Sequence, residues 1–221
     1  MRFVLEPLLA PERVSDLRQE LLAPDTPWRP GVETAGWHAR AVKQNRQLDR
    51  ASELHQQLSD TITTALLAHP LLQAAALPLR VPGLLFSRSG PGEGYGRHLD
   101  NAYMAGGRSD LSFTVFLGDP QSYEGGALVL ETDAGEEEVR SPAGHAFVYP
   151  STLLHRVEPV RSGERLVAVG WIESRVRSAE RRELLFELDT ARRALFGLEG
   201  KGEVFDLVSR SYTNLLRMWG E

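Results

Sequence analysis

The stretch GRHLDNA, residues 96–102, places His98 two residues before Asp100 inside a glycine-rich segment. An imidazole nitrogen and a carboxylate oxygen are both ligands for iron, manganese and zinc, so the pair raises the question of a metal site. The pair alone is weak support, because chance gives roughly 0.3 such spacings in a chain with six histidines and ten aspartates. A metal site here needs a third ligand from elsewhere in the sequence.

His155 is the candidate for that third ligand. It follows Asp100 by 55 residues, at the start of LHRVEPV, and is predicted to face His98 and Asp100 across two sheets. Two histidines and one carboxylate on one face of an octahedron leave three positions open, which is the arrangement of non-haem Fe(II) oxygenases. The other histidine of this strand-rich part, His145 in PAGHAFVYP, is predicted to lie on a strand surface rather than to bind metal.

Arg165 follows His155 by ten residues, in the segment RLVAVGWI. On a strand it shares one face with Val167, Val169 and Trp171. A charged residue on an otherwise apolar face requires an anion, and the guanidinium fork matches a carboxylate. The combined pattern is much more specific than the first pair. It fits a metal that chelates one end of 2-oxoglutarate while Arg165 binds the other end.

The composition agrees with ligands of this kind. The chain has no cysteine, which excludes disulfides, iron–sulfur clusters and thiolate zinc sites and leaves iron, manganese or a three-ligand zinc site. Basic and acidic residues are mixed along the chain with a net charge of −5, so no nucleic acid partner is expected. Glu6 and Pro7 interrupt the first apolar run, and no run reaches the 18 apolar residues of a membrane span. A cytoplasmic protein is expected, and a homo-oligomer remains open.

Three stretches of different periodicity position these residues. Residues 1–78 are predicted to be mostly helical support, with apolar stripes after Pro11 and from Ala51 to Leu66 that Pro70 ends. Residues 79–174 form the core of short strands, and residues 175–221 form a helical pair split by GLEGKG. The expected strands are GLLFSRS, LSFTVFL, GALVLET, EEEVR, HAFVYP, LHRVEPV and RLVAVGWIE. This order favours an α+β fold with a double-sheet jelly roll.

The sequence resembles the bacterial PKHD-type hydroxylases, which are Fe(II)- and 2-oxoglutarate-dependent dioxygenases akin to prolyl and lysyl hydroxylases. The stretches that carry the resemblance are YGRHLDNA, SDLSFTVFLGDPQSYEGGALVL, SPAGHAFVYPSTLLHRVEPVRSGER, WIES, LLFELD and YTNLLRMW. The resemblance implies a double-stranded β-helix core, with His98, Asp100 and His155 as iron ligands and Arg165 as the 2-oxoglutarate residue. It also implies ascorbate as the reductant that keeps the iron reduced, and a link to iron uptake.

One position departs from the family pattern. Where the family usually has Arg-Tyr, this chain has Arg88 and Ser89. In related hydroxylases a tyrosine near this point helps to hold the distal carboxylate of the co-substrate. Tyr95 is a candidate to take up part of that role in binding the co-substrate.

Several alternatives stay open at this point. A cupin-type zinc or manganese enzyme fits a similar barrel, although the HxH pair of cupins is absent, and a non-catalytic iron-sensing jelly-roll module would keep the ligands. Lys43 and Asn45, in AVKQNRQ, belong either to a substrate-contacting lid or to an ordinary polar loop. His38, His55 and His69 are predicted to be solvated or capping. The substrate is left as an amino acid, a peptide or a siderophore-like molecule.

Overall fold

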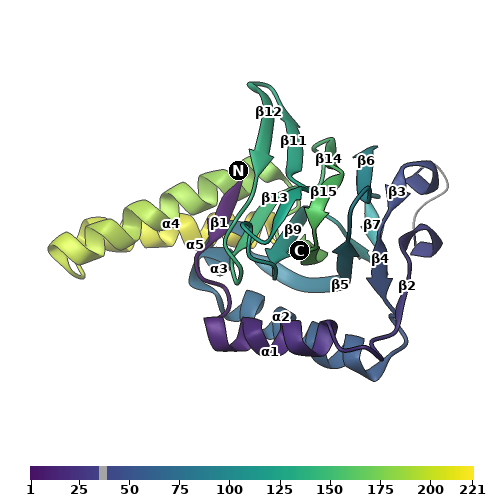
Figure 1. The fold of residues 1–221 in the computed structure, drawn as a ribbon. Helices are drawn as coiled ribbons and strands as arrows, with labels where there is room; N and C mark the ends of the chain where they lie inside the picture. Colours follow the sequence, from purple (N-terminus) through teal and green to yellow (C-terminus); the bar gives the residue numbers. More distant parts are fainter. Residues whose placement is uncertain (35–38) are drawn as a thin grey trace.

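Two antiparallel β-sheets form the centre of the computed structural model, which describes residues 1–34 and 39–221 (Figure 1). The larger sheet consists of β1 (Phe3–Leu5), β13 (Ala146–Pro150), β9 (Leu111–Phe116), β16 (Arg165–Ser174), β5 (Pro78–Ser89), β4 (Arg46–Leu48) and β2 (Trp28–Pro30), in that order across the sheet. The smaller sheet consists of β12 (Gly135–Val139), β11 (Leu128–Thr132), β14 (His155–Val157), β6 (Gly94–His98) and β3 (Lys43–Gln44). The predicted double-sheet jelly roll is confirmed.

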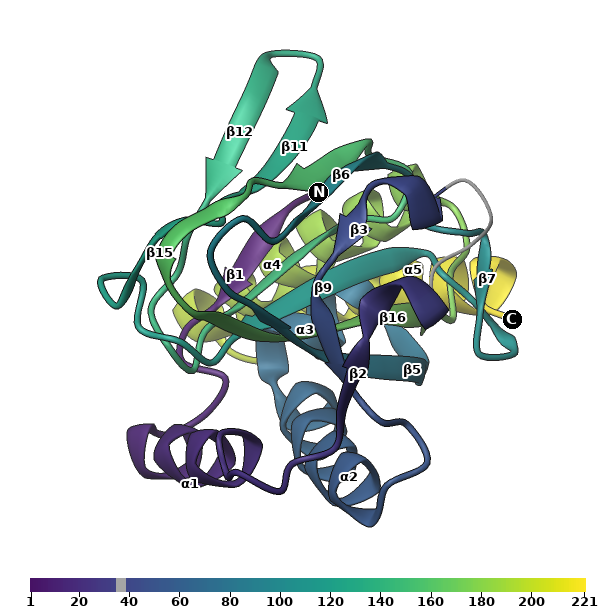
Figure 2. The ribbon, with the colours of Figure 1, turned by 45° about the vertical axis from the view of Figure 1, so that its right-hand side comes forward.

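Two small ribbons complete the strand structure. One pairs β10 (Tyr123–Gly125) with β15 (Val160–Gly163), and the other pairs β7 (Tyr103–Met104) with β8 (Gly107–Arg108). The hairpin of β11 and β12 extends away from the rest of the fold (Figure 2), and β12 is an edge strand of the smaller sheet. Its run of three glutamates suits such an edge, because charged side chains discourage pairing with another chain.

Helices cover the face of the larger sheet that is turned away from the smaller one (Figure 2). These are α1 (Pro11–Leu21), α2 (Glu53–Ala68) and α3 (Pro70–Ala76), with short 3-10 turns η1 (Gly31–Thr34) and η2 (Ala39–Ala41) nearby in the chain. The apolar stripes predicted from the sequence are the buried faces of α1 and α2, and include Leu17, Leu21, Leu58 and Ile62. Their burial against the sheet forms the main hydrophobic core.

Pro70 acts differently from the prediction. The stripe of α2 does end before it, but Pro70 also occupies the first turn of α3. A proline is tolerated there because the first helical N–H has no intrahelical partner. The imidazole of His69 caps the same helix by accepting a hydrogen bond from the Leu71 N–H. The helical support therefore continues to Ala76.

The C-terminal helical pair is confirmed as α4 (Ala179–Glu199) and α5 (Glu203–Trp219), which form a hairpin that extends to one side of the sheets (Figure 1). The turn between them is shorter than GLEGKG, since α4 continues through Gly197 and ends where Gly200 has a φ of 72°. Glycine adopts such a positive φ without a steric penalty because it has no Cβ. Among the described residues, no helix combines the length and the apolar character that a membrane crossing requires.

Four strands in the N-terminal stretch were not predicted: β1, β2, β3 and β4. Each has only two or three residues, which is too short to show a period of two. They matter for the site, because β4 extends the larger sheet beside β5 and β3 extends the smaller sheet beside β6. The N-terminal stretch thus contributes to both walls of the space between the sheets.

Candidate active site

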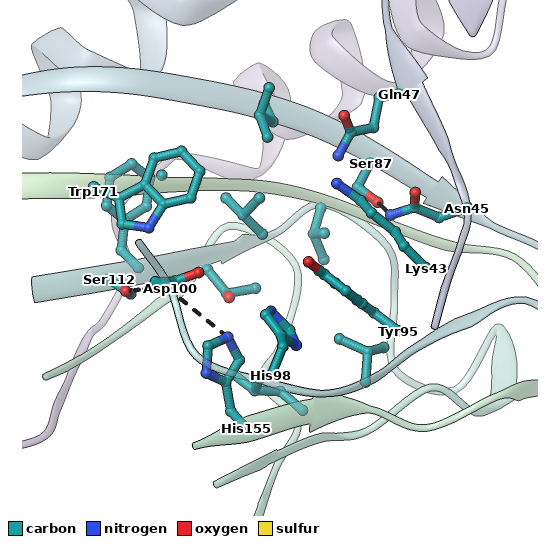
Figure 3. Close-up of a pocket in the computed structure, with 18 of the residues that line it drawn as sticks. Lys43, Asn45, Gln47, Ser87, Tyr95, His98, Asp100, Ser112, His155 and Trp171 are labelled. Carbon is teal, nitrogen blue, oxygen red and sulfur yellow. Dashed lines mark hydrogen bonds and ion pairs between the residues drawn. The ribbon is translucent and has the colours of Figure 1, made fainter. Parts of the chain in front are cut away.

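A cavity lies between the two sheets (Figure 3). Alternation along the strands of the larger sheet decides which side chains reach it. On β16, Arg165, Val167, Val169 and Trp171 line the cavity, while Leu166, Ala168 and Ile172 face the helices. The expectation that Arg165 shares one face with these three apolar residues agrees with this arrangement.

The three candidate metal ligands meet at this cavity. One ligand atom from each of His98, Asp100 and His155 lies within 4.8 Å of the other two, and Nε2 of His155 is 4.0 Å from Oδ2 of Asp100. His98 ends β6 and His155 begins the neighbouring strand β14, where the two residues are direct cross-strand partners. The prediction that His155 faces the other two across two sheets was wrong, because β6 and β14 belong to the same sheet.

Hydrogen bonds fix the tautomer of both imidazoles. Nδ1 of His98 lies 2.8 Å from the carbonyl oxygen of Gly96, and Nδ1 of His155 lies 3.0 Å from that of Leu153. Because a carbonyl oxygen only accepts, each Nδ1 carries the proton and donates it. Each Nε2 therefore has its lone pair available, which is the orientation that a metal-binding histidine needs.

The carboxylate of Asp100 is held by a chain of hydroxyl groups. Ser112 Oγ donates to Asp100 Oδ2 over 2.6 Å, and the hydroxyl of Ser151 lies 2.8 Å from that of Ser112. Since Ser112 has one proton and gives it to Asp100, Ser151 must donate to Ser112. This arrangement holds the carboxylate of Asp100 beside the two imidazoles.

Burial sets the charge of His98. The pKa of His98 is lowered to about 4, first because burial disfavours the charged ring and then because of repulsion from His155. A neutral imidazole at pH 7 is the form that binds metal. Tyr95 stacks on the His98 ring, with centroids 3.6 Å apart and an angle of 17° between the planes. Burial raises the pKa of Tyr95 to about 12, so its hydroxyl keeps its proton at pH 7.

Arg165 is buried, with 3% of its surface exposed. Its Nε is a buried donor that has no hydrogen-bond partner among the described residues. Burial lowers its pKa, while Tyr123 and Tyr149 act in the opposite direction. Gly126 leaves room for its stem, since a Cβ at that glycine would lie 3.0 Å from Cδ of Arg165. An unpaired guanidinium N–H on a cavity wall is suited to an anionic ligand.

Ser89 is the direct cross-strand partner of Arg165, on β5, and is itself buried. The departure from the family pattern therefore lies on the same wall as the guanidinium and within the cavity lining. Tyr95 belongs to the opposite sheet, where it stacks on His98. Both residues line one cavity from its two sides.

Sequence reasoning missed Ser112 and the buried indole N–H of Trp171, which has no hydrogen-bond partner among the described residues. The signal for Ser112 was present in LSFTVF, where Ser112 and Thr114 alternate with apolar residues that face the helices. Lys43 and Asn45 also line the cavity, from β3 and from the residue that follows it. They are part of the wall rather than of a lid.

The remaining histidines lie elsewhere. His145 precedes β13 and lies outside the metal-ligand cluster and the cavity lining, within the part of the chain that is described. His69 is a helix cap, as predicted. The prediction for His55 was wrong, because this residue is 8% exposed and packs edge-on against Phe86 in the core. His38 lies outside the described residues.

Comparison with solved structures identifies the fold. A prolyl-4-hydroxylase of Pseudomonas putida superposes with a TM-score of 0.54 at 23% identity, covering 79% of this chain and 92% of that one. HygX of Streptomyces hygroscopicus, solved with nickel, 2-oxoglutarate and hygromycin B, gives 0.57 at 16% identity and covers 78% of this chain and 82% of its own. This chain thus shares its overall architecture with these two proteins.

Sequence comparison is more specific. Residues 84–173 match the 2OG-Fe(II) oxygenase superfamily, and residues 180–221 match the PKHD-type hydroxylase C-terminal domain. A PKHD-type hydroxylase of Prochlorococcus marinus (strain MIT 9313) is 50% identical over 220 residues, covering 100% of both chains. Another from Synechococcus elongatus is 55% identical over 195 residues, which is 86% of this chain and 87% of that one. The chain belongs to the PKHD-type hydroxylases, and the resemblance drawn from the sequence is confirmed.

Proposed function

We propose that this protein binds Fe(II) through His98, Asp100 and His155, binds 2-oxoglutarate with the help of Arg165, and hydroxylates a substrate in the cavity between the sheets. The observation that carries the proposal is the convergence of the three ligand atoms within 4.8 Å, in a cavity that Arg165 also lines. The likeness to HygX, whose structure holds nickel and 2-oxoglutarate, supports the same use of this fold.

The residues fit the metal and the co-substrate. Two imidazole nitrogens with their lone pairs available and one carboxylate are the donors that non-haem iron takes, with positions left open for other ligands. The unpartnered Nε of Arg165 fits the far carboxylate of 2-oxoglutarate. When bound, iron and 2-oxoglutarate supply the oxidising chemistry, in which 2-oxoglutarate and dioxygen yield succinate, carbon dioxide and a hydroxylated C–H bond.

The chain's own residues position and enclose the reactants. Ser112 holds the carboxylate of Asp100 through its hydroxyl, and the backbone carbonyls of Gly96 and Leu153 hold the two imidazoles. Apolar side chains exclude water from the cavity, which strengthens the pairing of Arg165 with a carboxylate. Those side chains include Leu128, Val157, Val167 and Val169. Tyr95 keeps its hydroxyl proton and is proposed to help in binding 2-oxoglutarate.

The proposal extends to the setting of the reaction. Ascorbate keeps the iron reduced, the protein acts in the cytoplasm, and its chemistry is linked to iron homeostasis. Residues 79–174 carry the site, residues 1–78 support it and residues 175–221 form a helical appendage. The substrate is an amino acid, a peptide or a siderophore-like molecule. Self-association of the chain is compatible with each of these proposals.

Formation of succinate from 2-oxoglutarate tests the reaction. The purified protein, freed of metal by a chelator and reloaded with Fe(II), is expected to release succinate only when Fe(II), 2-oxoglutarate and dioxygen are all present. The rate should increase when the substrate is added. Anaerobic addition of 2-oxoglutarate to the Fe(II) form should also produce a visible charge-transfer band. Absence of both the band and the succinate in a folded, iron-loaded sample would overturn the proposal.

A further inference from the structure

Lys43 is a second buried cation of the cavity. It lies on β3, at the edge of the smaller sheet, with 5% of its surface exposed. Its direct cross-strand partner is Tyr95, and its Nζ is 5.1 Å from the centre of the tyrosine ring. Figure 3 shows Tyr95 between His98 and Lys43, with the lysine side chain extending towards Ser87 on the facing sheet. The Lys43 side chain thus extends across the cavity, and the Tyr95 ring separates it from the candidate metal ligand His98.

Lys43 and Arg165 occupy different parts of the cavity. Lys43 lies on β3 of the smaller sheet, beside Tyr95, whereas Arg165 lies on β16 of the larger sheet, beside Ser89. 2-Oxoglutarate has only two carboxyl ends. In the proposed function one end lies at the metal ligands and the other at Arg165, so the co-substrate leaves Lys43 to a different group.

The charges of the cavity favour an anion beside Lys43. Among the described residues that line it, Lys43 and Arg165 are cations and Asp100 is the single carboxylate. The two positive charges of a bound Fe(II) would balance the two negative charges of 2-oxoglutarate. Of the charges on Lys43, Arg165 and Asp100, one positive charge then remains in excess. The ammonium is poorly solvated because only 5% of the Lys43 surface is exposed, and this burial lowers the pKa of Lys43 to about 8. An anion placed beside it would offset this cost.

Polar groups from the larger sheet surround the same place. Gln47 on β4 and Ser87 on β5 are cross-strand partners, and both line the cavity. Nδ2 of Asn45 donates a hydrogen bond to Oγ of Ser87 over 2.8 Å. Because that bond uses Ser87 as the acceptor, the Ser87 hydroxyl proton is available to a ligand. The Ser87 hydroxyl thus adds a hydrogen-bond donor on the wall that the Lys43 side chain extends towards.

We propose that Lys43 binds a carboxylate of the substrate, so that the substrate is a small acid or a chain end with a free carboxylate. This inference rests on the proposed function and narrows its substrate class. The carboxylate pairs with the Lys43 ammonium on one side of the Tyr95 ring, and the C–H bond to be oxidised lies on the other side, near His98. An internal peptide segment without an acidic group does not meet this requirement.

The sequence allows a direct test, because the chain contains only two lysines, Lys43 and Lys201. Protein labelled with 13C at lysine Cε gives one resonance from the cavity and one from the exposed Lys201, which serves as an internal reference. Diamagnetic Zn(II) replaces Fe(II), and saturating 2-oxoglutarate is added. The probes are the common L-amino acids, each compared with its own α-amide, which has the same side chain without the carboxylate.

The expected result is that 2-oxoglutarate leaves the Lys43 resonance nearly unchanged, while at least one amino acid shifts it and its amide does not. In the iron-loaded protein, that acid should stimulate succinate release at least about tenfold more effectively than its amide. Lys43→Met should reduce this preference below about twofold without changing 2-oxoglutarate affinity. Lys43→Arg should retain part of it, and Lys201→Met should behave as wild type.

Three outcomes would overturn the inference. The first is a Lys43 resonance that moves with 2-oxoglutarate alone, which would assign the lysine to the co-substrate. The second is a response to amides equal to the response to acids, and the third is no response to any acid in the panel. Failure of the proposed function is distinguishable, because it would show as loss of the 2-oxoglutarate charge-transfer band in the Fe(II) protein before any probe is added.

Discussion

His98 and His155 are direct partners across the antiparallel strands β6 and β14, and their ring centroids are 4.2 Å apart. Two rings at opposite positions of one strand pair are held by the backbone ladder rather than by flexible loops. The ligand separation is therefore determined by the sheet, and Asp100 completes the set two residues beyond the end of β6. A site built in this way should keep its geometry in the metal-free protein.

Replacing any one of His98, Asp100 and His155 by alanine should abolish Fe(II)-dependent formation of succinate, since two ligands remain. The metal content after dialysis should fall in parallel, and circular dichroism checks that each variant is folded. His145→Ala is the matched control and should keep its metal. Equal loss of metal in His145→Ala and His155→Ala would show that the third ligand is misassigned.

Arg165→Ala should weaken 2-oxoglutarate binding by about 30-fold to several thousandfold. Truncating one member of a buried charge pair costs roughly 2–5 kcal/mol, and each 1.4 kcal/mol corresponds to a factor of ten. Arg165→Lys should retain part of the affinity as a point charge without the fork. Anaerobic titration of the Fe(II) protein measures these constants, and an unchanged constant in Arg165→Ala would remove the residue from the site.

Ser89→Tyr should tighten 2-oxoglutarate binding by about tenfold. The residue faces the cavity as the cross-strand partner of Arg165, so a phenol there can donate to the carboxylate that Arg165 binds. A hydrogen bond to a charged group contributes about 1.5–3 kcal/mol. Ser89→Phe adds the same ring without the hydroxyl and should not tighten binding. Weaker binding in both variants would mean that the ring is too large for the cavity.

Ser112→Ala should weaken metal binding by about 10–100-fold, the usual effect of removing a group that orients a ligand. The change removes the donor to Asp100 and leaves the fold intact, because the lost atom is a single hydroxyl. Competition with a chromophoric chelator measures the affinity. Ser162→Ala, on an exposed part of β15, is the control. An affinity in Ser112→Ala equal to that of wild type would show that the hydrogen bond does not position Asp100.

Acidification should destabilise the protein partly through His55. Burial lowers its pKa below the ordinary 6.5, so the folded state keeps the ring neutral while the unfolded state protonates it. The unfolded state binds more protons, and stability is therefore lost as the pH falls below about 6.5. Urea unfolding at pH 7.5 and 5.5 should show a smaller pH-dependent loss in His55→Gln than in wild type. An equal loss in both proteins would contradict this role.

Long strands with an apolar pattern were predicted, but β6, which has five residues and carries His98, lies in the glycine-rich GEGYGRH and was not predicted. LSFTVFL and RLVAVGWIE show the period of two and became β9 and β16, and they position Ser112 and Arg165 on one wall. The two-residue strand β3 shows no period, so Lys43 was not placed beside Tyr95. The spacing of His98 and His155 indicated a common site but not a common sheet. Tertiary packing determines which strands that are distant in sequence become neighbours. A local sequence pattern carries no information about this pairing.

The candidate metal centre has two imidazoles, one carboxylate and no thiolate, and this donor set does not discriminate strongly between divalent ions. Affinity for nitrogen and oxygen ligands rises from manganese and iron through cobalt and nickel to copper. Which metal ion occupies the centre then depends on which ion is available rather than on the selectivity of the ligands. Protein prepared on a nickel resin would be expected to carry nickel, and its turnover should return after stripping and reloading with Fe(II). When iron is scarce, competing cations would be expected to replace it in this centre. The activity would then fall while the amount of protein stays the same.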